Sequence, residues 1–175
     1  ENMSAKPDSN YAIAKNNASN YLLKLHRNKK FPVVIVRPYQ VYGPYQDSNR
    51  LIPIVINNCL KNKKFPCSDG KQFRDFLFVK DFSKIIFKLL VNKRCIGEIF
   101  NIGSGKAYNV KNFINLIQKL INKGFPKFGK IKLRKEENLC TFPSTQKIKK
   151  FINLPKNTKL KDGLLKTIKF YRGSN

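Results

Sequence analysis

The first apolar and small side chains of the chain recur at intervals of three and four residues, the spacing of one face of an α-helix. These positions are Tyr11, Ala14, Ala18, Tyr21, Leu22 and Leu25. Asp8 or Ser9 stands before them as a candidate N-cap. Residues 33–36 are all β-branched and have prolines on both sides, which predicts a buried parallel strand covered on both faces. A helix followed by such a strand favours an α/β fold.

Similar patterns predict the remaining elements. Helices are expected over residues 51–62, 82–92, 110–123, 144–152 and 159–171, and short strands over 76–79 and 98–102. Pro53 would lie in the first turn of its helix, and Asp81 would cap the next one. That helix should pack through Phe82, Ile85, Ile86, Leu89 and Leu90. The clearest stripe is Val110, Phe113, Ile114, Ile117, Leu120 and Ile121.

Lysine dominates the composition and gives the chain a formal net charge of +26. Such a charge fits a protein that binds nucleic acid or another polyanion, because clustered cations release counterions from phosphates. The lysines, however, are spread from Lys6 to Lys169 and form no single basic tail. A solvated, lysine-rich surface is therefore favoured over a dedicated polyanion site.

The four cysteines show no C-x-x-C spacing and no nearby histidine, so we expect reduced thiols and no metal site. No segment reaches the roughly 18 to 20 apolar residues needed to cross a bilayer. The first residues also lack the charged-then-apolar pattern of a signal peptide. These observations predict a soluble, cytoplasmic protein.

A tyrosine and a lysine stand four residues apart on the first predicted helix, at Tyr11 and Lys15. In a chain this rich in lysine the spacing arises readily by chance, so it decides nothing alone. Its chemistry is nevertheless useful, because residues four apart on a helix have Cβ atoms about 5 to 6 Å apart. At about 6 Å and an effective dielectric constant of about 20, an ammonium attracts a tyrosinate by about 2.8 kcal/mol. That attraction favours the proton-accepting form of the phenol.

Four short motifs follow one another: Tyr11-x-x-x-Lys15, "VRPYQVYGP", "RDFLFVKD" and "FNIGSGKAYNV". In this order they make the chain resemble the C-terminal half of the extended short-chain dehydrogenase/reductases, the NAD-dependent nucleotide-sugar epimerases and dehydratases. The resemblance implies a Rossmann-like α/β fold with a small substrate-binding region. Residues 1–50 and 75–105 would be the remnant of the Rossmann-like part, and residues 51–74 and 106–175 the substrate-binding region.

The resemblance also implies a chemistry. NAD or NADP would be the cofactor, and the substrate would be a UDP-, dTDP- or CDP-linked sugar, as in polysaccharide biosynthesis. A complete enzyme of this kind would be a homodimer. Tyr11 and Lys15 match the catalytic pair, and they would contact the cofactor together with Pro38 and Tyr39.

The resemblance assigns substrate contacts to Gln40, Arg50, Leu51, Arg74, Arg134 and Glu137. Gln40 and Arg50 stand where relatives carry asparagine. Arg74 matches an arginine that binds a substrate phosphate, a role that suits a planar guanidinium. An ion pair of Arg74 with Asp75 or Asp81 is the alternative.

Two parts of the family's site have no counterpart in this sequence. Only ten residues precede Tyr11, whereas the family places a serine or threonine some two dozen residues upstream. No glycine-rich turn joins an early strand to a helix, and "GSG" at residues 103–105 fits a tight turn better than a phosphate cradle. We therefore expect a truncated or split enzyme, inactive alone unless a separate chain supplies the N-terminal half. A basic nucleic-acid-binding or polyanion-binding protein on a degraded scaffold, and a non-functional gene fragment, are the alternatives.

Overall fold

The computed structural model describes residues 7, 9–133 and 137–173. The helices are α1 (Asn10–Lys29), α2 (Leu51–Leu60), α3 (Val79–Val91), α4 (Val110–Ile121), α5 (Gln146–Phe151) and α6 (Leu160–Gly173), with a 3-10 turn η1 (Lys93–Cys95). The strands are β1 (Ile35–Pro38), β2 (Gln40–Tyr42), β3 (Lys64–Pro66), β4 (Phe73–Arg74), β5 (Phe76–Phe78), β6 (Ile99–Ile102), β7 (Tyr108–Asn109), β8 (Phe125–Lys127) and β9 (Cys140–Thr141). Within the described ranges, no helix is both long and apolar enough to cross a lipid bilayer.

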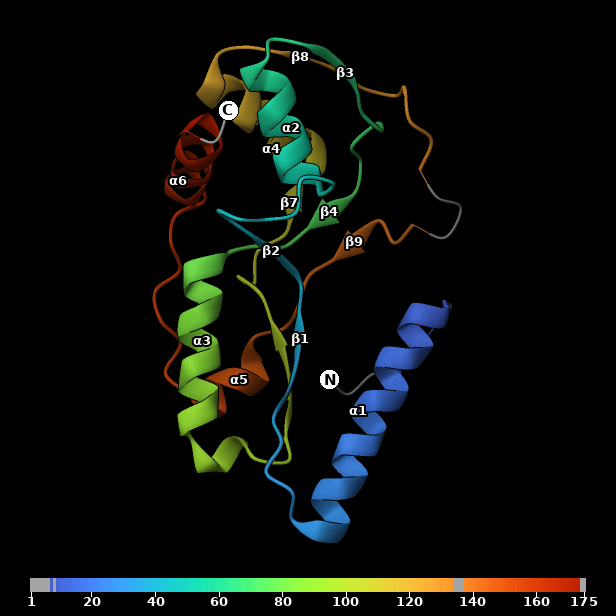
Figure 1. Ribbon diagram of the computed structural model, residues 1–175, viewed down its shortest axis with the longest axis vertical. Coiled ribbons are helices and arrows are strands. Elements are labelled where there is room, and N and C mark those ends of the chain that lie inside the picture. The colour runs from blue at the N-terminus through green and yellow to red at the C-terminus, as the bar shows by residue number, and fades with distance from the viewer. Residues whose placement is uncertain (1–6, 8, 134–136, 174–175) are drawn as a thin grey trace.

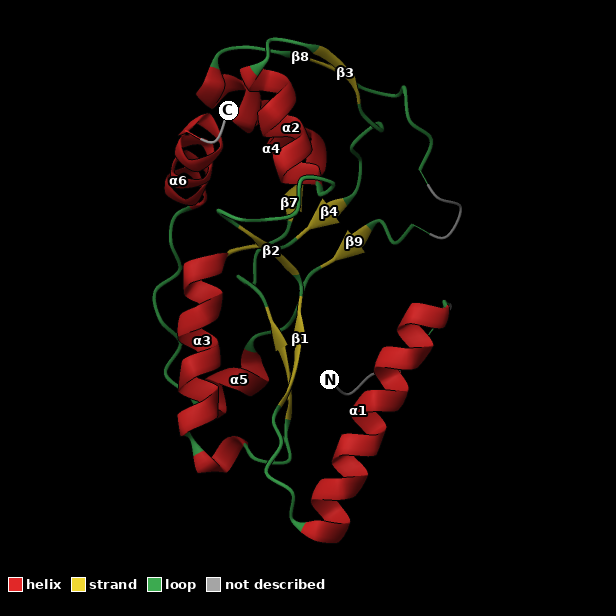
Figure 2. Cartoon of the chain, viewed as in Figure 1, coloured by secondary structure: helices red, strands yellow, loops and turns green. Residues whose placement is uncertain are grey.

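Two parallel strand pairs run through the middle of the molecule (Figure 2). β1 pairs with β6, with Ile35 opposite Ile99, and β2 pairs with β5, with Gln40 opposite Phe76. Because Tyr39 alone separates β1 from β2, the two pairs follow one another along the chain. α3 connects β5 to β6 and lies on one side of β1, whereas α1 lies on the other (Figure 1). This mixed α/β arrangement confirms the predicted fold class.

The apolar side chains gather in two clusters. In one, α2, α4 and α6 pack around Phe113, whose ring stacks on that of Phe76 with centres 3.8 Å apart. In the other, Leu77, Leu89 and Phe100 pack with α5 beneath the β1–β6 pair. The predicted division of the chain into a Rossmann-like and a substrate-binding region stays a prediction.

The stripe predicted for α4 is confirmed. Val110, Phe113, Ile114, Ile117 and Ile121 are buried, and Leu120 packs against the same cluster. Pro53 lies in the first turn of α2, as expected, where its missing N–H costs no helical hydrogen bond. Amphipathic patterns of this strength determine a helix locally, because each turn buries the same face.

Helix α1 forms where the sequence predicts it, but its apolar stripe stays uncovered. Ser9 caps the helix by accepting a hydrogen bond from the amide of Ala12. No residue of α1 is buried, and Tyr11 and Tyr21 are 73% and 63% exposed. A hydrogen bond forms near the C-terminal end of α1, between the His26 ring and the carbonyl oxygen of Phe31. The described part of the chain therefore leaves the face of α1 unpartnered.

Strand β1 differs from its prediction in both position and burial. It covers Ile35–Pro38, two residues later than expected, because its ladder begins where Ile35 meets Ile99, the first residue of β6. Ile35 is buried, Val36 and Arg37 are half-buried and Pro38 is exposed. The expectation of a strand covered on both faces was therefore wrong for the chain described here.

Helix α3 differs from its prediction in where it begins and in which side chains it buries. The helix begins at Val79, so Asp81 lies inside its first turn and is not the N-cap. The buried Asp81 carboxylate instead accepts hydrogen bonds from the amide and hydroxyl of Thr158, which ties α3 to the loop before α6. Leu90 was expected in the packed face but is 71% exposed, whereas Leu89 is 1% exposed.

These adjacent leucines give a stability test. Leu90→Gln should change the free energy of unfolding by less than about 0.5 kcal/mol, because its side chain is already in water. Leu89→Gln should destabilise strongly, since it places an amide in an apolar core. Urea unfolding followed by circular dichroism measures both variants. Equal losses from the two substitutions would contradict this orientation of α3.

Candidate active site

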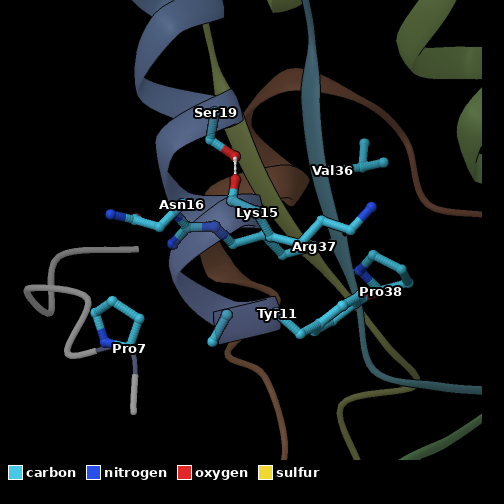
Figure 3. A pocket seen from close by; sticks show the side chains of 9 residues that line it. Pro7, Tyr11, Lys15, Asn16, Ser19, Val36, Arg37 and Pro38 are labelled. Atoms are coloured by element: carbon cyan, nitrogen blue, oxygen red, sulfur yellow. Dashed lines mark hydrogen bonds between the residues drawn. The ribbon is translucent and has the colours of Figure 1, made fainter. Parts of the chain in front are cut away.

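A cavity of about 540 Å³, here called the α1 cavity, opens between α1 and β1. It brings together three of the predicted cofactor-binding residues: Tyr11, Lys15 and Pro38. Figure 3 shows the Tyr11 side chain pointing from α1 towards Pro38. The fourth predicted cofactor residue, Tyr39, does not line this cavity but follows Pro38 directly, and its amide donates to the carbonyl oxygen of Ile102.

The geometry of the tyrosine–lysine pair follows from the helix. Lys15 Nζ lies 5.5 Å from the centre of the Tyr11 ring, an approach that two residues four apart on one helix face can make. Both side chains leave α1 on the face turned to β1 (Figure 3). The Ser19 hydroxyl donates a hydrogen bond to the carbonyl oxygen of Lys15, at 2.9 Å. The arrangement places an ammonium beside a phenol at the open side of a strand.

A second cavity, here called the α2 cavity, has a volume of about 390 Å³ and lies among α2, β3, β4 and α4. It gathers four of the predicted substrate-binding residues: Gln40, Leu51, Arg74 and Glu137. Arg50 does not line it; this residue precedes α2 at the N-cap position and makes no side-chain cap hydrogen bond. Arg134 lies outside the described residues.

The two cavities are lined from neighbouring positions on one short stretch of backbone. Pro38 lines the α1 cavity and Gln40 lines the α2 cavity. Because an extended chain advances about 3.3 Å per residue, these two linings are about 7 Å apart along the chain. Tyr39 is the residue between them.

Arg74 is the cation best placed in the α2 cavity. Its side chain is 13% exposed, and one guanidinium nitrogen donates to the carbonyl oxygen of Phe73 at 2.7 Å. The other terminal nitrogen forms an ion pair with Glu137, whose side chain is 28% exposed. The ion-pair partner is thus neither Asp75 nor Asp81, the two that the sequence suggested.

Asp75 has a different task. This carboxylate is fully buried and accepts hydrogen bonds from the amides of Ser104 and Lys106 and from the Ser104 hydroxyl. The "GSG" loop therefore uses its donors on the protein's own carboxylate, and the tight-turn interpretation holds. Gly103 is required at this point, because a Cβ there would lie 2.9 Å from an Asp75 oxygen and 2.5 Å from Pro143.

Two side chains of these cavities were not singled out from the sequence. Gln72 lines the α2 cavity, 8% exposed, with its amide nitrogen 3.5 Å from the Ser68 hydroxyl; its amide oxygen has no hydrogen-bond partner among the described residues. It stands directly before β4 and two residues before Arg74, and side chains two apart on a strand share a face, a spacing that could have indicated it. Arg37 lines the α1 cavity from β1, directly before Pro38.

The thiol in the α2 cavity is part of its wall. Cys67 lines the cavity, and burial raises the pKa of its thiol above the ordinary value. The neighbouring Cys59 has a pKa raised to about 11, first by burial and then by Cys67. A thiol with a raised pKa is protonated at neutral pH and is a poor nucleophile. All four cysteines are free, as predicted.

The α1 cavity fits one end of a nicotinamide dinucleotide. Tyr11 and Lys15 offer hydroxyl and ammonium donors of the kind that bind ribose hydroxyls, whereas the Ser19 proton is already donated to the carbonyl oxygen of Lys15. The pyrophosphate needs other donors, such as amides at a glycine turn before a helix. In the part of the chain that the structure describes, the "GSG" loop has the glycines, but it bonds Asp75.

The family model described as the NAD dependent epimerase/dehydratase family matches residues 1–103. A dTDP-glucose 4,6-dehydratase from Haemophilus influenzae is 40% identical over 99 residues, which cover 55% of this chain and 29% of that protein. A dTDP-glucose 4,6-dehydratase from Streptomyces niveus is 28% identical over 95% of this chain and 49% of its own length. The chain thus spans about half or less of these two relatives.

Solved structures agree with this assignment. The structure of Pal from Bacillus thuringiensis matches all of this chain and 56% of its own, with a TM-score of 0.91 and 30% identity. A UDP-glucuronic acid 4-epimerase from Bacillus cereus, solved with UDP-glucuronic acid and NAD, has the same TM-score and coverage at 26% identity. The resemblance to the extended short-chain dehydrogenase/reductases is confirmed, and the chain belongs to the NAD-dependent epimerase/dehydratase family.

Proposed function

We propose that this chain is the substrate-binding and proton-transferring part of an enzyme that modifies nucleoside-diphosphate sugars with NAD or NADP. The observation that carries the proposal is the junction at Tyr39. On one side lies a tyrosine–lysine pair, and on the other lies a cavity with a partly buried arginine. A sugar attached to a diphosphate on Arg74 could extend from the α2 cavity towards Tyr11. The Bacillus cereus relative solved with UDP-glucuronic acid supports this substrate class.

Each residue has a defined part in the proposed reaction. The Tyr11 phenolate accepts a proton from a sugar hydroxyl, and the Lys15 ammonium stabilises the negative charge of that phenolate. Arg74 holds the diphosphate through charge-assisted hydrogen bonds and so fixes the position of the sugar. The bound nicotinamide would supply the hydride acceptor. Epimerisation and dehydration both begin from this proton transfer, whereas a reduction would use its reverse, with the Tyr11 phenol giving a proton to the carbonyl oxygen.

The described residues provide part of the proposed cofactor site, and a further part is proposed to pack beside β1. β1 has β6 as its single ladder partner among the described residues, so its other edge is available for a further parallel strand. The face of α1 is also uncovered beside it. We propose that an N-terminal half with the pyrophosphate-binding turn packs here, either as an earlier part of the same polypeptide or as a separate chain.

The substrate site can be tested on the 175-residue chain. Arg74→Ala should weaken the binding of UDP or dTDP by about tenfold to a hundredfold, because a hydrogen bond to a charged group contributes about 1.5–3 kcal/mol. Isothermal titration calorimetry at fixed salt measures this change. Arg172→Ala, which removes an exposed arginine from the last turn of α6, is the matched control for charge. Equal losses from both substitutions would show that the nucleotide binds the basic surface and not the α2 cavity.

A further inference from the structure

The cation proposed to receive a phosphate already has an anionic partner. Of the described residues that line the α2 cavity, Arg74 and Lys132 carry positive charge, and Glu137 carries negative charge. Glu137 binds a terminal nitrogen of Arg74, and the two residues are 63 positions apart in the sequence. This pairing is therefore a product of the fold and not of local spacing.

The two partners are held unequally. Arg74 is anchored by the carbonyl oxygen of Phe73 and is 13% exposed, so its guanidinium cannot turn to solvent without losing that bond. The Glu137 side chain is about twice as exposed, at 28%, and among the described residues it pairs with Arg74. A guanidinium so removed from water needs an anion beside it. If the pair opens, Glu137 is the partner that can move into water.

We propose that Glu137 is an internal competitor of the substrate's diphosphate: its carboxylate occupies Arg74 in the empty α2 cavity and must leave before a phosphate binds. The inference rests on the proposed function. A diphosphate carries more charge than a carboxylate and accepts hydrogen bonds from several directions, so it can displace Glu137. Affinity for the nucleotide is then reduced by the free energy of the Arg74–Glu137 pair, and the guanidinium stays paired at all times.

A competitor and a direct substrate contact predict opposite changes in nucleotide affinity when Glu137 is replaced. If Glu137 bound a sugar hydroxyl, its removal would weaken nucleotide binding. If it competes for Arg74, its removal should tighten the binding of any diphosphate, including one without a sugar or base. Inorganic pyrophosphate is therefore the decisive probe.

The experiment compares the dissociation constants of pyrophosphate and UDP for the 175-residue chain and its variants by isothermal titration calorimetry. Glu137→Gln should bind pyrophosphate about tenfold more tightly, the factor expected from releasing one charged hydrogen bond. Glu137→Ala should also increase the affinity for pyrophosphate. Asp69→Asn removes the same charge from an aspartate that pairs with Lys71 and does not line the α2 cavity.

A double-mutant cycle isolates the pair. In an Arg74→Met background, Glu137→Gln should tighten pyrophosphate binding no more than Asp69→Asn does. A gain in affinity that persists without Arg74, or one matched by Asp69→Asn, would overturn the competitor role. So would weaker UDP binding with unchanged pyrophosphate binding, a result that leaves the proposed nucleotide site standing. Absence of UDP and pyrophosphate binding in every variant would overturn the proposed function itself.

Discussion

Replacing Tyr11 with phenylalanine should lower turnover by about 10²- to 10⁴-fold in a protein that carries both halves of the fold. The loss is expected because Tyr11→Phe removes the hydroxyl that we propose exchanges a proton with the sugar, and no other atom. The affinity for the sugar nucleotide should change little, since Arg74, the proposed ligand of the diphosphate, lines the other cavity. Removing an interaction that is made only in the transition state lowers kcat and kcat/KM together.

The structure makes Tyr11→Phe a clean test. In the 175-residue chain the tyrosine is 73% exposed and belongs to neither apolar cluster, so the phenylalanine variant of this chain should melt at the same temperature as the unchanged chain. Tyr21→Phe is the matched control, because Tyr21 lies on the same helix and is similarly exposed but does not line the α1 cavity. Near-normal turnover in Tyr11→Phe, measured with a sugar nucleotide and NAD, would make the Tyr-x-x-x-Lys spacing a coincidence of a lysine-rich chain.

Replacing Asp75 with alanine should destabilise the fold by about 3–5 kcal/mol. The carboxylate is fully buried and accepts three hydrogen bonds from the loop that follows β6. Without it, the amide and the hydroxyl of Ser104 lose their partner, and each buried donor left unpaired costs about 1–3 kcal/mol, whereas the Lys106 amide keeps its hydrogen bond to the Ser104 hydroxyl. The cavity left by the side chain adds to this loss.

Urea unfolding measures the change, with Asp69→Ala as the control. Asp69 also accepts a backbone hydrogen bond, from Lys71, but its side chain is 37% exposed. We expect its loss to cost less than about 1 kcal/mol, because water replaces the bond. If Asp75→Ala is no more destabilising than Asp69→Ala, the loop does not depend on the buried carboxylate.

Asp75→Ala should also weaken nucleotide binding. Asp75 directly follows Arg74, the last residue of β4, so a shift of the backbone at Asp75 would move Arg74.

Part of the proposed site could be predicted from the sequence because its residues lie close together in the chain. Tyr11 and Lys15 share a helix, and helical geometry alone determines their separation. Gln40 and Leu51 were identified by motif and do line one cavity. Gln72 was missed because no motif marks it, and its importance depends on burial and on an amide oxygen that no described residue bonds.

By itself, the sequence determined the helices whose apolar spacing is strong, such as α4, because their hydrogen bonds are local and their stripes describe one buried face. It also determined the family, through four motifs in order. Only the tertiary structure decided the register of β1, the exposure of Leu90 and the partner of Arg74. Each of these depends on which distant segment lies alongside. Arg74 has acidic neighbours at Asp75 and Asp81 in the sequence, yet it pairs with Glu137, because the fold turns those two carboxylates towards Ser104 and Thr158.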